Sequence, residues 1–435
     1  MGKFFLQNFG CRATQADGAA LEAELLGRGF QPAHRQCADL VILNTCTVTA
    51  SADEDVRQAV RQVRRENPLA HIVVTGCYAQ RAPQELAALP GVTWVVGNSH
   101  KAAIPAMLAG QEAGALPYHG LIQVGDIFAQ HEFLAGVVKD TAGDRTRPNL
   151  KIQDGCNNRC SFCIIPFVRG RSRSARPEWV IEQVRHLSPR YRELVLSGIN
   201  LGGWGRDLDL RMRLADLVRR LLEETGLERL RLSSVEPMDL SDDLLGLVAS
   251  SPRIARHVHA PLQTGSDAVL RRMHRKYRPR HYEDRIRKAR QWMPEAAIGA
   301  DVMVGFPGET EEEFEQNRSF IQSLPFTYLH VFTYSARPGT PAAAAPSQVP
   351  VPVRKQRNRI LRELAATKNL EFRRRMAGQK LPVVTLEQSG AALSDNYLKV
   401  ELARPRVPNR LIDVEIGGVT PQGLREKNPL ELPTS

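Results

Sequence analysis

Cysteine is scarce in this chain, which has seven cysteines among 435 residues. An odd number of thiols argues against a disulfide framework. The chain also lacks an arginine-led apolar leader at its start and any apolar run long enough to cross a bilayer. These absences predict a soluble cytoplasmic protein without a membrane partner.

Positive charge, in contrast, is plentiful. Lysine and arginine outnumber aspartate and glutamate by 59 to 47, which gives a formal net charge of +12. Such an excess favours a polyanionic partner, most simply a nucleic acid.

Three of the seven cysteines, Cys156, Cys160 and Cys163, lie within eight residues. Thiolates are soft ligands that suit iron–sulfur clusters or zinc. A closed structural zinc site needs four ligands, so three thiolates favour a four-iron cluster that keeps one iron open. The alternatives are a zinc knuckle whose fourth ligand comes from elsewhere, and unrelated cysteines in a loop.

Residues 1–115 alternate short apolar runs with helical patterns, which predicts an α/β domain built on a doubly wound parallel sheet. The predicted strands are 4–9, 39–45, 71–76 and 93–97, and the predicted helices are 17–28, 51–66 and 83–88.

Three more cysteines, Cys11, Cys46 and Cys77, each directly follow one of these strands. The carboxyl ends of parallel strands meet at one edge of a sheet, so the three thiols should converge into a second cluster site. Chance placement of three buried thiols is the alternative. Cys37 precedes a strand, and we interpret it as an ordinary free cysteine.

A linker at residues 116–143, with one strand at 121–124, leads to a second domain at 144–376. Six strand signals separated by helical patterns predict a partial (βα)6 barrel with its functional residues at the carboxyl ends of the strands. The predicted strands are 150–155, 193–199, 229–235, 257–262, 297–304 and 328–334. The first of them ends at the three-cysteine loop.

The other strand ends carry small and polar residues of the kind that a bound nucleoside and amino acid require. Ordinary turn chemistry is the alternative for each of them. The candidates are Ser197, Gly198, Ser233, Glu236, Gln263, Asp301 and Gly305. We expect His257 and His259 to pack or to form hydrogen bonds rather than to bind a metal.

Residues 349–378 read as one basic helix, and short strands at 380–386, 397–402 and 411–416 predict a small β-barrel-like module at 377–435. Cations in this helix and around the barrel mouth are candidates for phosphate contacts. They are Arg169, Arg171, Arg173, Arg275, Arg354, Arg357, Arg373, Arg374 and Arg375.

With these patterns in place, the chain resembles the methylthiotransferase branch of the radical S-adenosylmethionine enzymes over nearly its whole length. Within that branch it is most similar to the enzymes that act on N6-threonylcarbamoyladenosine in tRNA. The stretches that carry this likeness are 44–49 (NTCTVT), 76–80 (GCYAQ), 96–101 (VGNSHK) and 151–158 (KIQDGCNN).

The resemblance implies a radical-SAM barrel, a terminal TRAM domain and two 4Fe-4S clusters. The trio of Cys156, Cys160 and Cys163 would hold the cluster that cleaves S-adenosylmethionine, and the trio of Cys11, Cys46 and Cys77 would hold an auxiliary cluster that carries the sulfur. Two S-adenosylmethionine molecules per turnover would supply a methyl group and a 5′-deoxyadenosyl radical. The product would carry a methylthio group at C2 of adenosine 37, next to the anticodon of the tRNA. A flavodoxin or a ferredoxin would donate the electron.

The chain departs from the family pattern near the first thiol, where Arg12 and Thr14 stand in place of the usual Lys and Asn. Other readings stay open. The substrate could be isopentenyladenosine in tRNA or a ribosomal-protein aspartate, and a non-catalytic RNA-binding iron–sulfur carrier would belong to a different class.

Overall fold

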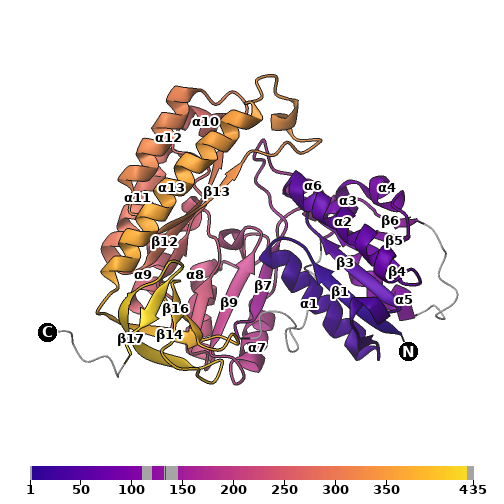
Figure 1. The fold of residues 1–435 in the computed structure, drawn as a ribbon, viewed down its shortest axis with the longest axis horizontal. Coiled ribbons are helices and arrows are strands. Elements are labelled where there is room, and N and C mark those ends of the chain that lie inside the picture. Colours follow the sequence, from indigo (N-terminus) through magenta and orange to yellow (C-terminus); the bar gives the residue numbers. More distant parts are fainter. Residues whose placement is uncertain (1, 110–119, 132, 134–145, 429–435) are drawn as a thin grey trace.

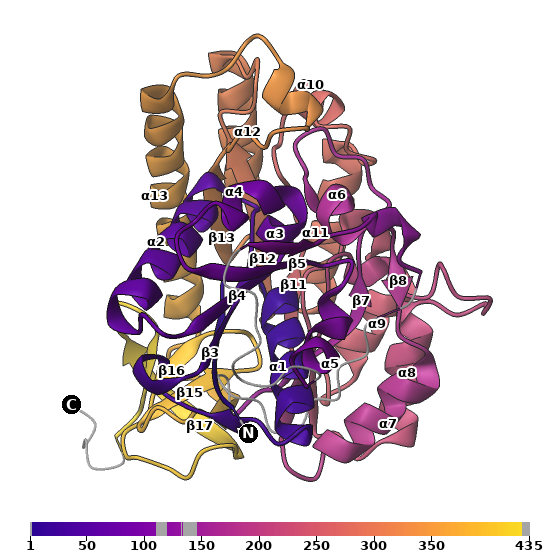
Figure 2. The ribbon, with the colours of Figure 1, turned by 90° about the vertical axis from the view of Figure 1, so that its right-hand side faces the viewer.

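The structure is a computed structural model that describes residues 2–109, 120–131, 133 and 146–428. An α/β domain, a partial barrel and a small closed β-barrel follow one another along the chain. Figure 1 shows the first domain (indigo) against one side of the partial barrel and the terminal module (yellow) against its base; Figure 2 gives the perpendicular view. The predicted fold class is confirmed.

The N-terminal sheet has six parallel strands in the order β2-β1-β3-β4-β5-β6. Neighbouring side chains along a strand point to opposite faces, so Leu40 and Ile42 pack under one set of helices, while Val41 and Leu43 pack under another. The strands are β1 (Lys3–Asn8), β2 (Gln31–Pro32), β3 (Leu40–Thr45), β4 (His71–Gly76), β5 (Val92–Gly97) and β6 (Leu121–Gln123). The helices are α1 (Arg12–Gly27), α2 (Ala50–Glu66), α3 (Cys77–Arg81), α4 (Pro83–Ala87) and α5 (Ile104–Ala109).

Strand β6 is the strand predicted inside the linker, and it extends this sheet beyond residue 115. Most of the remaining predicted linker lies outside the described residues. Helix α1 starts one turn earlier than predicted, because Cys11 takes the N-cap position and its carbonyl accepts the Gln15 amide.

The partial barrel contains the six predicted parallel strands. They form two sheets, which adjoin where β10 bridges the segment before β11. The strands are β7 (Asn149–Asp154), β9 (Glu193–Gly198), β10 (Arg229–Leu232), β11 (His257–His259), β12 (Ala297–Val304) and β13 (Tyr328–Thr333), and the two-residue β8 (Arg173–Ser174) pairs antiparallel with β7.

Amphipathic helices surround these strands and close one large apolar core. They are α6 (Ile165–Arg169), α7 (Pro177–Leu187), α8 (Leu214–Glu224), α9 (Asp242–Ser250), α10 (Asp267–Arg272), α11 (Pro279–Trp292), α12 (Glu311–Ser323) and α13 (Val351–Arg375). None of the helices within the described ranges is both long and apolar enough to cross a membrane.

The terminal module closes into a barrel in the order β14-β15-β16-β18-β17. Three strands were predicted, whereas β15 and β18 were missed because neither contains the β-branched or aromatic residues that are typical of strands. The strands are β14 (Lys380–Thr385), β15 (Ala391–Ser394), β16 (Lys399–Glu401), β17 (Leu411–Val419) and β18 (Leu424–Glu426).

Arg231 joins this module to the partial barrel. Its guanidinium pairs with the fully buried Glu193 at 2.7 Å and donates hydrogen bonds to the carbonyls of Ser394 and Asp395, both at 3.0 Å. A buried cation with four of its five N–H donors bound fixes the position of the module.

Removing that cation should therefore destabilise the fold. We expect Arg231→Met to lower the free energy of unfolding by about 3 kcal/mol, because Glu193 loses its main partner in a desolvated site. Arg192→Met is the matched control: Arg192 pairs with Glu228 at a partly exposed site, so its loss should cost less than about 1 kcal/mol. Equal losses in urea unfolding would contradict this assignment.

Candidate functional site: two thiol trios at a domain junction

The N-terminal trio lies at one edge of the first sheet, as predicted. Cys11, Cys46 and Cys77 follow β1, β3 and β4, which are adjacent strands. Gly10 has a φ of +94°, and a Cβ there would lie 2.7 Å from the Cys46 sulfur, so only glycine allows this approach. Burial, together with the neighbouring Cys77 and Cys11 thiols, raises the pKa of Cys46 to about 12. The three thiols therefore lie within electrostatic reach of one another.

Two polar side chains contact this trio directly. The Asn98 amide donates to the Cys77 sulfur at 3.5 Å, and Thr14 lies 3.6 Å from the Cys11 sulfur. Thr14 thus keeps a contact at the position where the family that the chain resembles usually has Asn. Donors of this kind suit a cluster held by thiolates, because they stabilise the charge on sulfur.

The second trio lies on the loop between β7 and α6. The backbone N–H of Asn158 donates to the Cys156 sulfur at 3.4 Å, and the backbone N–H of Cys163 donates to the Cys160 carbonyl at 3.1 Å. Burial raises the pKa of Cys156 to about 11 and that of Cys163 to about 12. Arg275 donates to the Cys160 sulfur at 3.2 Å and so places a positive charge beside this loop.

Neither trio is arranged around a single ion. A tetrahedral zinc ion with bonds of about 2.3 Å would bring its sulfur ligands to about 3.8 Å from one another. Across the described residues, the one group of three ligand atoms within 4.8 Å of one another is His259, Asp301 and His330, and it contains no cysteine. The wider spacing disfavours the zinc knuckle and fits ligands of a larger cluster.

The two trios meet through helix α6. Ile164 and Val168, which flank the second trio, share a small apolar core with Cys77 of the first. The Asn98 amide that contacts Cys77 also donates to the Val168 carbonyl at 2.8 Å. The two thiol trios therefore lie on opposite sides of one packed contact between the domains.

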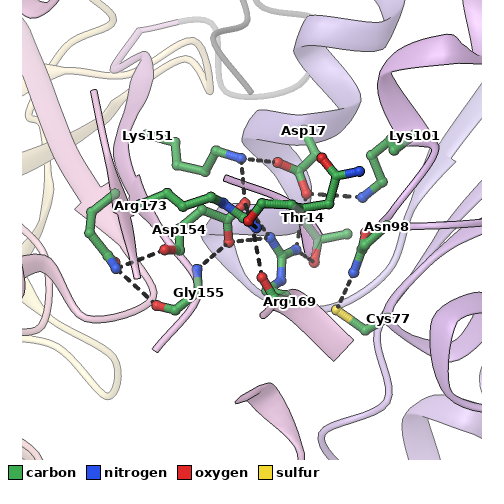
Figure 3. A network of polar contacts seen from close by, with 12 residues as sticks. Thr14, Asp17, Cys77, Asn98, Lys101, Lys151, Asp154, Gly155, Arg169 and Arg173 are labelled. Atoms are coloured by element: carbon green, nitrogen blue, oxygen red, sulfur yellow. Dashed lines mark hydrogen bonds and ion pairs between the residues drawn. The ribbon is translucent and has the colours of Figure 1, made fainter. Parts of the chain in front are cut away.

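A buried charge network holds this junction together (Figure 3). Arg169 of α6 pairs with Asp154 at 2.9 Å and with Asp17 of α1 at 3.0 Å. Lys101 also reaches Asp17 at 3.0 Å, and Lys151 pairs with both aspartates. Arg173 also approaches Asp154 at 4.0 Å, so four cations face two carboxylates, which leaves an excess of two positive charges.

The electrostatics of the network follow from this count. Burial alone would raise the pKa of Asp17, but Lys101, Lys151 and Arg169 hold it well below its usual range. Burial opposes the charge on Arg169, yet Asp154 and the thiols of Cys77 and Cys11 raise its pKa well above the ordinary value. The excess positive charge is thus close to the first trio, where thiolates would need a counter-charge.

The phosphate-contact prediction is wrong for five of the nine arginines. Each of the five is buried and already bound within the protein, because carboxylates or carbonyls from distant segments reach it. They are Arg169, Arg173, Arg275, Arg357 and Arg373. The remaining four, Arg171, Arg354, Arg374 and Arg375, are exposed or half-buried.

Six of the seven predicted cofactor residues lie at or just beyond the carboxyl ends of strands, whereas Asp301 lies within β12. The side-chain oxygens of Ser197 and Ser233 and the Oε1 of Gln263 are buried without a hydrogen-bond partner among the described atoms. Such orphaned acceptors fit a polar ligand at the barrel mouth. Gly198 and Gly305 leave no free space for a Cβ, since it would come within 2.9 Å of Gln153 or closer still to Arg354.

The two carboxylates of that set already have partners. Glu236 pairs with Arg275, and burial raises its pKa despite that partner. Asp301 contacts His259 and His330, each at 3.3 Å. His257 and His259 bond to the Tyr328 hydroxyl, so the hydrogen-bonding role predicted for them is confirmed. His330 was missed, although it lies opposite Asp301 in the register of β12 and β13.

Comparisons with known proteins agree with this geometry. A family model described as "Radical SAM superfamily" matches residues 150–321, and one described as "Uncharacterized protein family UPF0004" matches residues 3–97. Among solved structures, the chain is similar to the radical S-adenosylmethionine methyltransferase TsrM from Kitasatospora setae, which was solved with cobalamin and a 4Fe-4S cluster bound. The match covers 79% of this chain and 77% of TsrM, with a TM-score of 0.57 and 17% sequence identity. The fold and the thiol loop define a radical S-adenosylmethionine enzyme.

Curated relatives narrow the family. Threonylcarbamoyladenosine tRNA methylthiotransferase MtaB of Aquifex aeolicus is 36% identical over 95% of this chain and 100% of its own, and that of Bacillus subtilis is 37% identical over 92% and 90%. The tRNA-2-methylthio-N(6)-dimethylallyladenosine synthase of Carboxydothermus hydrogenoformans is 33% identical over 86% of each chain. This chain belongs to the radical S-adenosylmethionine methylthiotransferases, which transfer a methylthio group.

The junction network predicts a distinctive response to acid. Because the folded-state pKa of Asp17 is lowered, its stabilisation is complete above the unfolded-state value of about 3.9 and is lost as the pH falls through the folded value. We expect Asp17→Asn to lower the free energy of unfolding of the cluster-free chain by about 3 kcal/mol or more at pH 7, and to flatten its decline below about pH 4.

Asp55→Asn is the control, because Asp55 is an exposed carboxylate in the same domain. It should change stability by less than about 0.5 kcal/mol and leave the acid response intact. Urea unfolding between pH 3 and pH 7 measures both effects. An Asp17→Asn variant whose pH profile parallels that of the wild type would contradict the assignment.

Proposed function

We propose that this chain methylthiolates C2 of N6-threonylcarbamoyladenosine beside the anticodon of tRNA. The observation that supports this most is the placement of two thiol trios on the two sides of one domain contact. A reaction that must both generate a radical and deliver sulfur needs two such centres close to one substrate. Relatives named for this nucleoside span nearly the full length of the chain.

In this proposal Cys156, Cys160 and Cys163 hold the 4Fe-4S cluster that binds S-adenosylmethionine, and Cys11, Cys46 and Cys77 hold a second 4Fe-4S cluster. Bound there, these groups supply the radical chemistry that an aromatic C–H requires, since it has no acidity for a base to exploit. A flavodoxin or a ferredoxin is the electron donor.

Several side chains are positioned to contact the cofactor and its cluster before either binds. Ser197 and Gln263 offer unpartnered polar atoms to the cofactor at the barrel mouth. Arg275 places its charge beside Cys160 and is itself oriented by Glu236. These contacts fix the donor geometry before any ligand binds, which lowers the reorganisation that binding requires.

The tRNA backbone would be held by the accessible cations that remain. Arg171 follows the loop of Cys156, Cys160 and Cys163, and Arg374 and Arg375 end helix α13. All three side chains are exposed. Arg354 is half-buried and already donates to the Tyr334 carbonyl at 2.8 Å. Contacts of this kind neutralise phosphates without reading bases.

The division of labour between the trios gives a test by single substitutions. We expect Cys156→Ala to abolish formation of 5′-deoxyadenosine in the anaerobically reconstituted enzyme under a strong reductant. Cys46→Ala should keep that cleavage and lose insertion of the methylthio group. Cys37→Ala is the control, because Cys37 is exposed and belongs to neither trio, and both activities should survive.

If the wild-type protein binds iron but never yields 5′-deoxyadenosine, the enzymatic proposal is wrong, and an RNA-binding iron–sulfur carrier becomes the better description.

The choice of nucleoside is tested in cells. We expect tRNA from a strain that lacks this protein to lose 2-methylthio-N6-threonylcarbamoyladenosine and to accumulate its precursor, as measured by nucleoside mass spectrometry. The second candidate is dimethylallyladenosine, which the name of a relative at 33% identity specifies. Loss of that methylthio product instead would reassign the substrate.

A further inference from the structure

A polar cavity of about 120 Å³ lies inside the partial barrel, where all three parts of the chain meet. The strands β10 to β13 form most of its wall. Arg12, from the first turn of α1, and Tyr397, from the turn between β15 and β16, complete it. Arg12 directly follows Cys11, so the residue next to one ligand of the first thiol trio lines this cavity.

Among the described residues of this wall, Arg12 is the charged side chain without a partner. Its side chain is half-buried, and within the described part of the chain its guanidinium has neither a carboxylate partner nor a hydrogen-bond acceptor. Its charge is nevertheless felt inside the cavity, because it contributes to the lowered pKa of His257 after burial, Arg231 and His259. A permanently charged guanidinium without a partner in such a site is poised for an anion.

The other charged groups of the cavity already have partners. Arg231 is bound to Glu193. Asp301 contacts the imidazoles of His259 and His330, each at 3.3 Å, and Ser233 presents an unpartnered buried hydroxyl. The cavity therefore combines one unpartnered cation with hydrogen-bonding groups.

We propose that this cavity binds the substituent on N6 of the adenine, and that Arg12 pairs with its carboxylate. This inference rests on the proposed function and adds a specificity-determining residue to it. The threonylcarbamoyl group bears a carboxylate, a hydroxyl and a urea, which match a cation and neutral polar groups. A dimethylallyl group offers only hydrocarbon, so it would bury the guanidinium without compensation.

The test compares two synthetic anticodon stem-loops bound to the reconstituted enzyme. One carries N6-threonylcarbamoyladenosine, and the other carries the same group with its carboxylate converted to an uncharged carboxamide. We expect Arg12→Gln to weaken binding of the first hairpin about tenfold or more, as loss of a charge-assisted pair should, and to leave binding of the second unchanged. Arg12→Lys should restore much of the lost affinity.

Arg28→Gln is the matched control, because it removes an equal charge from the far end of the same helix, where Arg28 is exposed beside Glu24. It should not alter the preference between the two hairpins. Iron and sulfide content, measured on each variant, should match the wild type.

Three results would overturn the assignment. The first is equal weakening of both hairpins by Arg12→Gln, which would make Arg12 a contact to backbone phosphate. The second is weaker binding of S-adenosylmethionine by this variant, because the carboxylate of that cofactor would then be the ligand. The third is an unchanged preference between the hairpins. Failure of the proposed function is separate: the wild-type enzyme would then leave the first hairpin without a methylthio group.

Discussion

The shared carboxylate of Asp17 is the interaction on which the arrangement of the domains depends. It comes from the first domain and is bound by Lys151 and Arg169 from the barrel, with every partner removed from solvent. Separating the domains would leave these charges desolvated without partners or would require their rehydration. The network therefore gives the junction a single geometry, and the two thiol trios keep a fixed relation to each other.

The same network links structure to chemistry. Arg169 belongs to the short helix that follows the loop of Cys156, Cys160 and Cys163, and the thiols of Cys77 and Cys11 in the other trio help to raise its pKa. One side chain thus joins the domains and provides positive charge beside sulfur. Arg12 provides a second such charge. It directly follows Cys11 of the first trio, and it lines the cavity that would receive the N6 substituent of the base.

Much of this could be predicted from the sequence, because alternating apolar runs locate the parallel strands and residues after such strands converge. That reasoning brought Cys11, Cys46 and Cys77 to one edge correctly. The prediction of phosphate contacts from clusters of basic residues failed for arginines such as Arg357 and Arg373. Burial of a cation depends on acceptors far away in sequence, and no local pattern indicates where those acceptors lie. His330 was missed for a similar reason, because only the pairing of β12 with β13 brings it to Asp301. The register of two paired strands cannot be predicted from the sequence of either strand alone.

The most direct test is low-temperature electron paramagnetic resonance on the anaerobically reconstituted and reduced protein. Two paramagnetic clusters on opposite sides of one packed contact should show dipolar splitting or enhanced relaxation. Both effects should vanish when either trio is replaced by alanine. A wild-type spectrum equal to the simple sum of the spectra of the two trio variants would contradict a shared junction.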